Sequence, residues 1–254
     1  MPGWLTAEML TRLRGGPWFA SLPPAMADAL LQAANLKRLQ AGETLFMRGA
    51  PADGIFAVLE GSLRVSGMTA DGKEAILSIL EAPQWLGEIA LFDGMPRTHD
   101  VVAESAVALL HVPRLALEAL LAREPLWWRD MGRLMAMKVR LAFIGMEDLS
   151  LYPAEVRLAR RLLLLVQSAV MDPSGRPPVL PLSQTQLGMM LSLSRQTTNQ
   201  ILQGLQQQGI LQVAYGRIEV RDLTRLAQVA ELEGMDRGLM AQVLPGNPEY
   251  QNKP

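Results

Sequence analysis

The sequence predicts an α+β chain built from an N-terminal β jelly-roll, a long central helix, and a C-terminal helix pair followed by a β-hairpin. Over residues 42–111, short β-type runs alternate with turn residues, a texture typical of small β-sandwiches and barrels. Residues 114–149 then keep a helical pattern in which Pro125 is the only proline. Beyond residue 182, two short amphipathic segments precede the hairpin pattern LQVAYGRIEVRD.

The composition is that of a water-soluble, folded protein. The chain has 254 residues, of which 49% are hydrophobic and 19% charged, enough for two modest domains with a core in each. No apolar run approaches the ~18 to 20 residues that cross a bilayer, and the start lacks a signal-peptide pattern. We therefore expect a cytoplasmic protein without a membrane partner. With no Cys and only His99 and His111, no metal site is expected.

Charge is unevenly distributed along the chain. Residues 1–154 contain 14 Lys and Arg against 17 Asp and Glu, whereas residues 155–226 contain 8 Arg against 4 acidic residues. A basic segment behind an acidic body favours a polyanionic partner for the second segment alone. Ordinary scatter of charges is the alternative explanation.

The N-terminal elements follow from local signals. Residues 1–36 read as helical, and Pro23 and Pro24 open a helix through residues 25–35. Strands are then predicted by the runs TLFM, IFAVLEG, SLRVSGM and AILSIL. Asp71-Gly72, flanked by two of these runs, is a strong hairpin signal.

The central helix carries an apolar stripe that is longer than one small barrel needs for cover. A helix over residues 126–149 would be ~36 Å long at about 1.5 Å per residue. We expect part of the stripe to pack against a second copy of the chain, with packing inside one chain as the alternative. Tyr152-Pro153 then breaks the helix as a hinge. The stripe steps by three or four residues through Trp128, Met131, Met135, Val139, Ala142, Met146 and Leu149.

These patterns divide the chain into four parts. Residues 1–124 form the N-terminal helices and the β-barrel, and residues 125–150 form the dimerisation helix. Residues 154–226 form the domain of short helices and hairpin, and residues 227–254 form a tail. The polar, proline-containing end of that tail, residues 245–254, is predicted to be disordered.

In the C-terminal part, two helices are joined by a tight turn. Ser183 begins a capping box that Gln186 completes, and Ser194 caps the next helix. The buried face of that helix is predicted to contain Thr198, Ile201, Leu202 and Leu205. The opposite face is polar and suits hydrogen bonding to base edges, although such faces also occur in helical domains that bind no DNA. The candidate DNA-binding residues, with the last one at the tip of a wing, are Ser183, Ser194, Arg195, Gln196, Thr197, Asn199, Gln200 and Arg217.

The stretch GEIALFDGMPRTHDVV, residues 87–102, places one carboxylate and one guanidinium on either side of a tight loop. The planar fork of Arg97 suits a phosphate, and the ionised Glu88 suits a hydroxyl donor such as a ribose 2′-OH. Gly87 allows the backbone to approach closely, and Thr98 adds a hydroxyl. This chemistry fits a cyclic nucleotide, provided that Arg97 faces an open cavity. The alternative is an internal Glu88–Arg97 ion pair that closes the loop without a ligand.

This loop, preceded by AGETLFMRGAPADGIFAVLEGSLRV and DGKEAILSIL, resembles a cyclic-nucleotide-binding domain with its phosphate-binding cassette. Joined to a long helix and to LSQTQLGMMLSLSRQTTNQILQGLQQQGIL, it is similar to the CRP/FNR family of bacterial transcription regulators over residues 17–225. The resemblance implies a winged helix-turn-helix and a homodimer that binds a near-palindromic site in double-stranded DNA and contacts RNA polymerase. It also implies a small-molecule effector, such as cAMP or cGMP, that reorients the DNA-binding domains.

The resemblance also assigns roles to residues of the barrel and the central helix. Glu88 would hold the ribose hydroxyl, while Arg97 and Thr98 would hold the phosphate. Ala142 and Phe143 stand where the cyclic-AMP-responsive member has two hydroxyl side chains near the adenine, so a different base preference is expected. The full ligand-binding set that it implies is Gly87, Glu88, Ile89, Arg97, Thr98, Ala142 and Phe143.

The alternatives concern both halves of the chain. Phe143 could fill the base site, which favours a vestigial pocket or another effector, such as a dinucleotide or a small aromatic acid. Gln196 and Gln200 stand where the cyclic-AMP-responsive member has Glu and Arg, so a different DNA site is expected. A helix pair that binds protein is a further alternative. An enzyme is not expected, since no nucleophile–base pair, metal cluster or second carboxylate accompanies Glu88.

Overall fold

A computed structural model describes residues 2–168 and 177–231. The chain divides into two compact units, residues 1–140 and residues 141–254, and the division falls inside the long helix. Most of the predicted loop 171–178 and of the predicted tail, including its polar end, lies outside the described residues. Among the residues that are described, no helix is long and apolar enough to cross a membrane.

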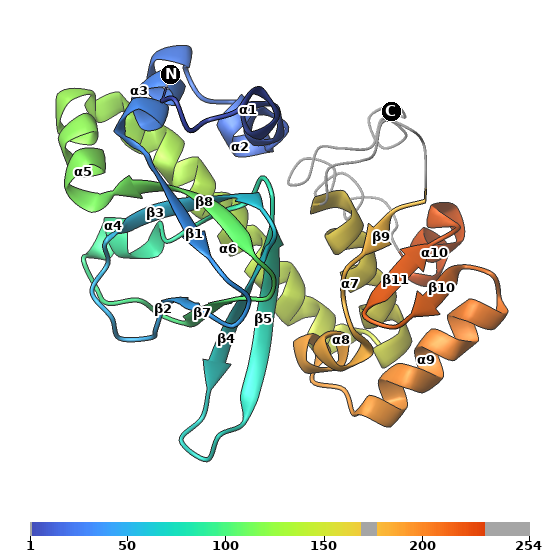
Figure 1. The fold of residues 1–254 in the computed structure, drawn as a ribbon. Helices are drawn as coiled ribbons and strands as arrows, with labels where there is room; N and C mark the ends of the chain where they lie inside the picture. The colour runs from blue at the N-terminus through green and yellow to red at the C-terminus, as the bar shows by residue number, and fades with distance from the viewer. Residues whose placement is uncertain (1, 169–176, 232–254) are drawn as a thin grey trace. The chain divides into compact units, whose positions relative to one another are not determined.

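The first unit is a β-sandwich bordered by helices, which confirms the predicted jelly-roll (Figure 1). Its two antiparallel four-stranded sheets have the strand orders β1-β8-β3-β6 and β2-β7-β4-β5. The Asp71-Gly72 signal lies in the turn between β4 and β5. The strands are β1 (Asn35–Leu39), β2 (Thr44–Phe46), β3 (Gly54–Glu60), β4 (Ser62–Met68), β5 (Glu74–Glu81), β6 (Trp85–Leu86), β7 (Asp100–Ala103) and β8 (Val107–Pro113).

Strand β3 is buried on both faces and so joins two hydrophobic cores. Phe56 and Val58 point between the two sheets, whereas Ile55, Ala57 and Leu59 point to the other face, where the helices pack. This two-sided burial explains why the strand reads as a continuous apolar run rather than as an alternating one. The helices of the unit are α1 (Ala7–Arg14), α2 (Pro17–Ala20), α3 (Pro24–Ala33), α4 (Ile89–Asp93) and α5 (Arg114–Arg123).

The long helix α6 (Trp128–Leu151) changes character along its length. It follows a single 3-10 turn, η1 (Pro125–Trp127), which opens with a proline, a residue that suits a first helical position because its missing N–H would have no intrahelical acceptor there. At its start, Met131 and Leu134 are buried in the helical core of the first unit. Further along, the predicted stripe lies on the surface, with Val139 43%, Met146 62% and Leu149 54% exposed.

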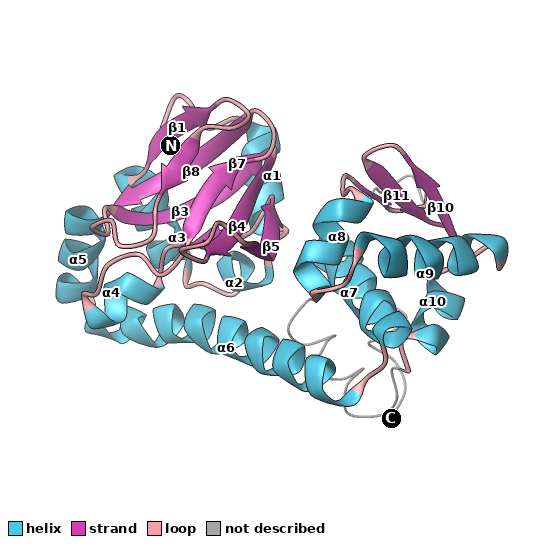
Figure 2. Ribbon diagram, turned by 90° about the horizontal axis from the view of Figure 1, so that it is seen from below, coloured by secondary structure: helices cyan, strands magenta, loops and turns pink. Residues whose placement is uncertain are grey.

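The second unit is mostly helical with one small sheet, whereas the first unit holds most of the strands (Figure 2). Its sheet has the order β10-β11-β9, and all of its strand pairs are antiparallel. Buried leucines and valines from all its helices form its interior. Its elements are α7 (Ala154–Ser168), β9 (Val179–Leu180), α8 (Gln184–Leu191), α9 (Arg195–Gln207), β10 (Leu211–Ala214), β11 (Arg217–Val220) and α10 (Leu223–Val229).

A buried ion pair spans the predicted break at Tyr152-Pro153. Helix α6 ends at Leu151 and α7 begins at Ala154, and Arg160 Nε lies 2.7 Å from Asp148 Oδ1 across the break. The same guanidinium lies over the ring of Tyr152, with 4.5 Å between its Cζ and the ring centroid. Burial of the neighbouring Arg161 lowers its pKa to about 10, while Asp148 favours its charged form.

Candidate functional site

The cassette between β6 and β7 is shaped by two glycines in left-handed conformation. Gly87 has a φ of 95° and leads into Glu88, which precedes the first residue of the short helix α4. Gly94, with a φ of 67°, ends that helix and accepts a conformation that other residues adopt at a cost. The chain then returns through Pro96 to Arg97, whose backbone N–H donates to the Ala50 carbonyl at 2.9 Å.

Arg97 lies inside the first unit and is 4% exposed. Its Nη2 donates to Asp53 Oδ1 and to the Gly54 carbonyl, both at 2.7 Å, and its Nη1 donates to the Gly87 carbonyl at 3.0 Å. The guanidinium also lies over the ring of Phe46, with 4.3 Å between its Cζ and the ring centroid. Its Nε, a further donor, is buried and has no hydrogen-bond partner among the described residues.

The expectation that Arg97 faces an open cavity is therefore wrong. The carboxylate of Asp53 supplies the negative oxygen that a ligand phosphate was expected to supply, and the ring of Phe46 lies against the guanidinium. The alternative of an internal Glu88–Arg97 pair is not seen either. Glu88 is 1% exposed, and its Oε2 accepts from Nζ of Lys138 on α6 at 2.7 Å. The two charged residues of the cassette thus have separate partners, and both partners belong to the chain itself.

Two glycines make this packing possible. A Cβ on Gly87 would lie 2.7 Å from Arg97 Nη1 and 2.9 Å from the Gly54 carbonyl oxygen. A Cβ on Gly54, whose φ is 148°, would lie 2.1 Å from the Val112 carbonyl oxygen. Since contacts below about 3 Å force atoms apart, both positions require glycine for the carbonyls to reach the guanidinium.

His111 on β8 adjoins the Asp53 side chain. Its Nε2 lies 3.9 Å from Asp53 Oδ2, and its ring stacks on Phe56 with 4.5 Å between centroids. Burial holds the pKa of His111 below its usual range, and the nearby cations Lys37 and Arg97 act in the same direction. The backbone and the carboxylate of Asp53 act the other way. The neutral ring is therefore the favoured form beside Arg97.

The other predicted ligand-binding residues lie on the surface. Ile89, at the start of α4, and Thr98 are exposed, and Thr98 Oγ1 lies 3.0 Å from Nδ1 of His99. Ala142 is exposed, and Phe143 is 63% exposed. These last two belong to the second unit, whereas the cassette belongs to the first.

In the second unit, the helix pair forms as the sequence predicts. Both hydrogen bonds of the capping box between Ser183 and Gln186 are present, which confirms it. The turn passes through Ser192 in left-handed conformation, and Ser194 then accepts from the Thr197 N–H at 3.0 Å. The buried face of α9 is confirmed for three residues, Thr198, Leu202 and Leu205, while Ile201 is half-buried.

Helices α8 and α9 cross at their closest point through Gly188. A Cβ there would lie 2.9 Å from Oγ1 of Thr198 and 3.2 Å from the Leu193 carbonyl oxygen. Thr198 is fully buried, and its hydroxyl donates to the Ser194 carbonyl at 3.0 Å. This contact packs the second helix closely against the first.

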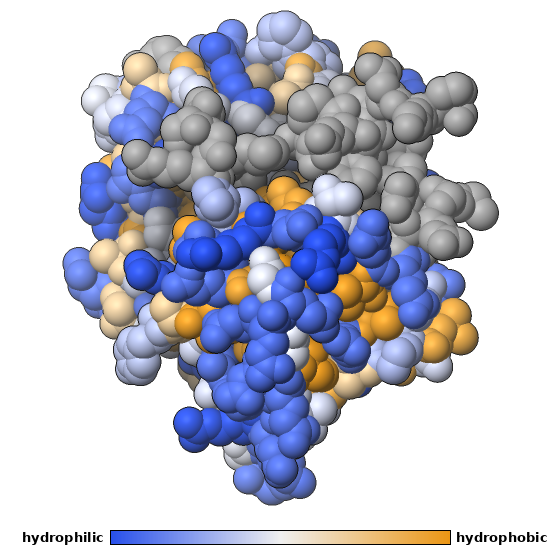
Figure 3. Space-filling model, turned by 90° about the vertical axis from the view of Figure 1, so that its right-hand side faces the viewer, coloured by the Kyte–Doolittle hydropathy of each residue, from blue (hydrophilic) through white to orange (hydrophobic). Residues whose placement is uncertain are grey.

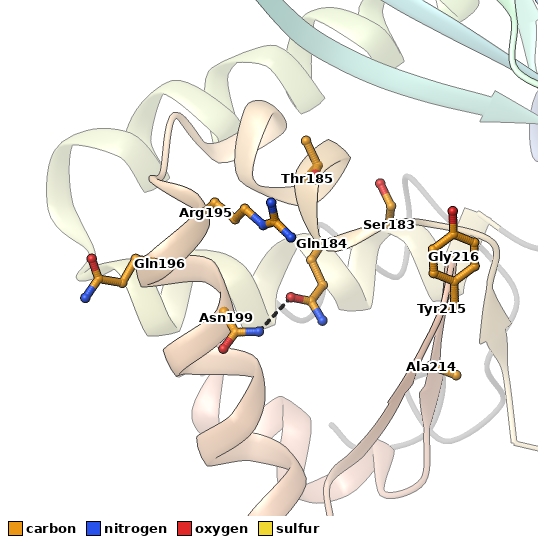
Figure 4. Close-up of a pocket in the computed structure, with 9 residues that line it drawn as sticks. All are labelled: Ser183, Gln184, Thr185, Arg195, Gln196, Asn199, Ala214, Tyr215 and Gly216. Atoms are coloured by element: carbon orange, nitrogen blue, oxygen red, sulfur yellow. Dashed lines mark hydrogen bonds between the residues drawn. The ribbon is translucent and has the colours of Figure 1, made fainter.

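The outer face of α9 opens onto a groove of about 950 Å³. Arg195 and Gln184 extend into this region (Figure 4). The opposite wall is the two-residue tip of the β10–β11 hairpin, where Tyr215 is fully exposed and Arg217 begins the second strand. The lining residues are Ser183, Gln184, Thr185, Arg195, Gln196, Asn199, Ala214, Tyr215 and Gly216.

The predicted DNA-binding residues fall into two groups. Arg195, Gln196, Gln200 and Arg217 are exposed and make no cap. Ser183, Ser194, Thr197 and Asn199 have hydrogen-bond partners within the unit.

Hydrophilic residues cover much of the molecular face drawn in Figure 3, with smaller hydrophobic areas between them.

Several residues at these sites were not predicted. Asp53, Phe46 and Gly54 surround Arg97, Lys138 pairs with Glu88, and Gln184 bonds to Asn199. The only local signal among them was the Asp53-Gly54 pair, whose glycine begins β3. Within the described residues, no group of three His, Cys, Asp or Glu is placed to hold a metal ion.

A β-sandwich with an arginine-bearing cassette, followed by a long helix and a winged helix-turn-helix, defines the class of two-domain transcription regulators. Comparison with known families agrees with this class. The cyclic nucleotide-binding domain family matches residues 36–124, and the Crp-like helix-turn-helix domain family matches residues 156–229.

Individual relatives point to the same family. The chain is 27% identical over 218 residues to the cyclic AMP receptor protein of Thermus thermophilus, a match that covers 86% of this chain and 98% of that protein. It is 26% identical over 213 residues to a CRP-like cAMP-activated global transcriptional regulator of Mycobacterium tuberculosis, covering 84% and 95%. The structure of FixK2 from Bradyrhizobium japonicum superposes with a TM-score of 0.70 at 22% identity, covering 79% of this chain and 99% of that one.

The chain belongs to the CRP/FNR family of transcription regulators. It carries a cyclic nucleotide-binding domain and a DNA-binding helix-turn-helix domain. The Mycobacterium tuberculosis relative is named as a transcriptional regulator.

Proposed function

We propose that the protein is a homodimeric transcription regulator whose binding to double-stranded DNA is modulated by a small anionic effector at the cassette, with a cyclic nucleotide, cAMP or cGMP, as the effector. The cassette lies within the segment that matches the cyclic nucleotide-binding domain family. Two relatives carry cyclic AMP in their names. As in other regulators of this kind, RNA polymerase would be the second macromolecular partner.

The observation that carries the effector proposal is the buried guanidinium of Arg97. Its Nε has no partner among the described residues, and a buried N–H without an acceptor costs about 1–3 kcal/mol. An anionic oxygen beside it would remove that cost. Three of its other N–H groups are held by two backbone carbonyls and by Asp53, whose side chain is 50% exposed. Asp53 is thus the partner that a phosphate can displace into solvent.

Glu88 suits a hydroxyl of the same ligand. Only its Oε2 is engaged by Lys138 in the contacts seen here, and a carboxylate accepts through both oxygens. Thr98, exposed next to Arg97, can donate to the same phosphate. The ligand would therefore meet one cation and one acceptor, as a cyclic nucleotide requires.

The alternative proposal keeps the DNA-binding regulator and drops the cyclic mononucleotide. Two observations favour it: Asp53 already supplies a negative oxygen to Arg97, and Phe143 is an exposed aromatic side chain that could fill the base site. The cassette would then be vestigial, or would serve an effector of different shape.

The exposed stripe on α6 supports the dimer. Phe143, Met146 and Leu149 are each more than half exposed, and apolar residues in such a row are stabilised by a matching helix. For the DNA half, the exposed Arg195, Gln196 and Gln200 of α9 support base reading, and the exposed Arg217 supports a phosphate contact from the wing.

Calorimetric titration of cAMP and of cGMP tests the effector. Wild type should bind one of them, Arg97→Ala should lose that binding at least tenfold, and the exposed Arg123→Ala should match wild type. Thermal unfolding of each variant checks that it folds. If wild type binds neither nucleotide, the cyclic-nucleotide proposal is wrong and the alternative stands.

Selection from random DNA fragments tests the regulator itself. Wild type should enrich a two-fold-symmetric site with half-sites centred about 10 to 10.5 base pairs apart, and its binding should weaken as salt rises. Met146→Glu should lower the dimer fraction in sedimentation, with Glu147→Gln as the control. If no fragment is enriched, with or without either nucleotide, the regulator proposal fails.

A further inference from the structure

An amide–amide hydrogen bond joins the two helices of the helix-turn-helix at the rim of the groove. Asn199 Nδ2, on α9, donates to Oε1 of Gln184, the first residue of α8, at 2.9 Å (Figure 4). Both side chains line the groove and are half-buried. Gln184 lies outside the set of residues that the sequence predicted for DNA binding.

This bond is not needed to hold the helices together. The contact between Gly188 and Thr198, with the buried Leu187, Leu202 and Leu205, already fixes how α8 meets α9. The amide pair lies outside that core, on the wall of the groove. Its effect is on the orientation of the Asn199 side chain, whose terminal torsion is otherwise broad.

The bond leaves Asn199 with the chemistry that an adenine edge requires. A side-chain amide has two N–H donors and one carbonyl oxygen, and Gln184 occupies one donor. One N–H and the oxygen remain, which match N7 and the N6 amino group of adenine in the major groove. If both amides are turned over, Asn199 still keeps a donor and an acceptor lone pair, so the match does not depend on that choice.

We propose that Asn199 reads an adenine by a bidentate contact and that Gln184 is a positioning residue that holds the Asn199 amide ready for it. This inference rests on the proposed binding of DNA through α9, and it adds a specific base and a specific supporting residue. Freezing a free side chain at an interface costs binding free energy because the side chain loses rotamer freedom. The bond from Gln184 removes part of that cost before DNA arrives.

The test measures Kd for the selected operator and for a panel in which each base pair is changed singly. Full-length wild type, Asn199→Ala, Gln184→Ala and Gln184→Glu are compared, with Gln207→Ala, an exposed amide of α9 outside the groove, as the matched control. Wild type and control should prefer adenine at one position of each half-site by about 5- to 150-fold. Asn199→Ala should lose that preference and keep the preferences at the other positions.

The two Gln184 variants separate positioning from a merely structural role. Gln184→Ala should reduce the adenine preference several-fold at the same position, with an unchanged melting temperature. Gln184→Glu keeps an acceptor for Asn199, so it should restore the preference while weakening all sequences equally through its charge.

Two results overturn the inference alone: an adenine preference that survives Asn199→Ala, or a loss in Gln184→Ala that is uniform across the panel. A wild-type chain that selects no operator overturns the proposed function and this inference with it. The two failures are therefore distinguishable.

Discussion

Replacing Asp53 by alanine should weaken the first unit and strengthen effector binding at the same time. Asp53 Oδ1 lies 2.7 Å from Nη2 of the buried Arg97, so it forms a charge-assisted hydrogen bond to a group that water does not reach. Such bonds contribute about 1.5–3 kcal/mol, and the half-exposed carboxylate discounts this to about 1–2 kcal/mol. An effector that must displace Asp53 loses the same amount. Removing the Asp53 carboxylate should therefore raise the affinity for the effector by about 5- to 30-fold.

The assay pairs urea unfolding with calorimetric titration of cAMP and cGMP. Asp71→Ala is the matched control, because Asp71 is an exposed aspartate in the β4–β5 turn of the same unit, bonded to Thr69 and Lys73 rather than to Arg97. Asp53→Ala should lower the urea midpoint of unfolding and raise the affinity for the nucleotide. Asp71→Ala should change neither quantity. Lower stability accompanied by weaker binding would refute the reasoning, since Asp53 would then support the ligand rather than compete with it.

Three further predictions follow from the same contacts. Gly87→Ala should destabilise the first unit by about 1–3 kcal/mol in urea unfolding, because its Cβ meets Arg97 and its φ is positive; an unchanged midpoint would contradict this. Gly188→Ala should unfold the second unit more readily by about 1–3 kcal/mol and reduce affinity for every DNA sequence alike, because the Cβ pushes against Thr198; a sequence-selective loss would count against it. His111 has a lowered pKa in the fold, so the unfolded chain binds more protons as the pH drops through about 6.5, and stability falls as the pH is lowered. His111→Gln should make that fall shallower between pH 7.5 and 5.5, and an equal slope in both proteins would refute the assignment.

Features that depend on neighbours along the chain could be predicted from the sequence. The capping box at Ser183, the hairpin at Asp71-Gly72 and the start of a helix at Pro24 each involve residues a few positions apart. The long helix also follows from its period, and only its first turn differs, because Pro125 opens a 3-10 turn before it. In these cases local hydrogen bonding and φ preferences decide the conformation.

The contacts of the two sites could not be predicted in the same way. Asp53 and Arg97 are 44 residues apart, and Lys138 and Glu88 are 50 apart. Ion pairs of this kind depend on how strands and helices pack, which spacing along the chain does not encode. The charged residues of the cassette could therefore be predicted from the sequence, but their partners in the fold could not. The same holds for Gln184 and Asn199, which are 15 residues apart and lie on different helices.

The pairing of Glu88 with Lys138 decides how a ligand at the cassette would influence the central helix. Glu88 is almost fully buried, so separating it from Lys138 would leave an uncompensated charge, at a cost of about 3–5 kcal/mol. A hydroxyl that bonds to the other carboxylate oxygen avoids this cost, and a phosphate beside Arg97 competes with Asp53 instead. Lys138 lies where α6 changes from the buried Leu134 to the exposed Val139. A ligand shifts an equilibrium between two conformations only if its affinity for them differs. Effector control through α6 therefore requires that the contact between Glu88 and Lys138 differ between the two conformations.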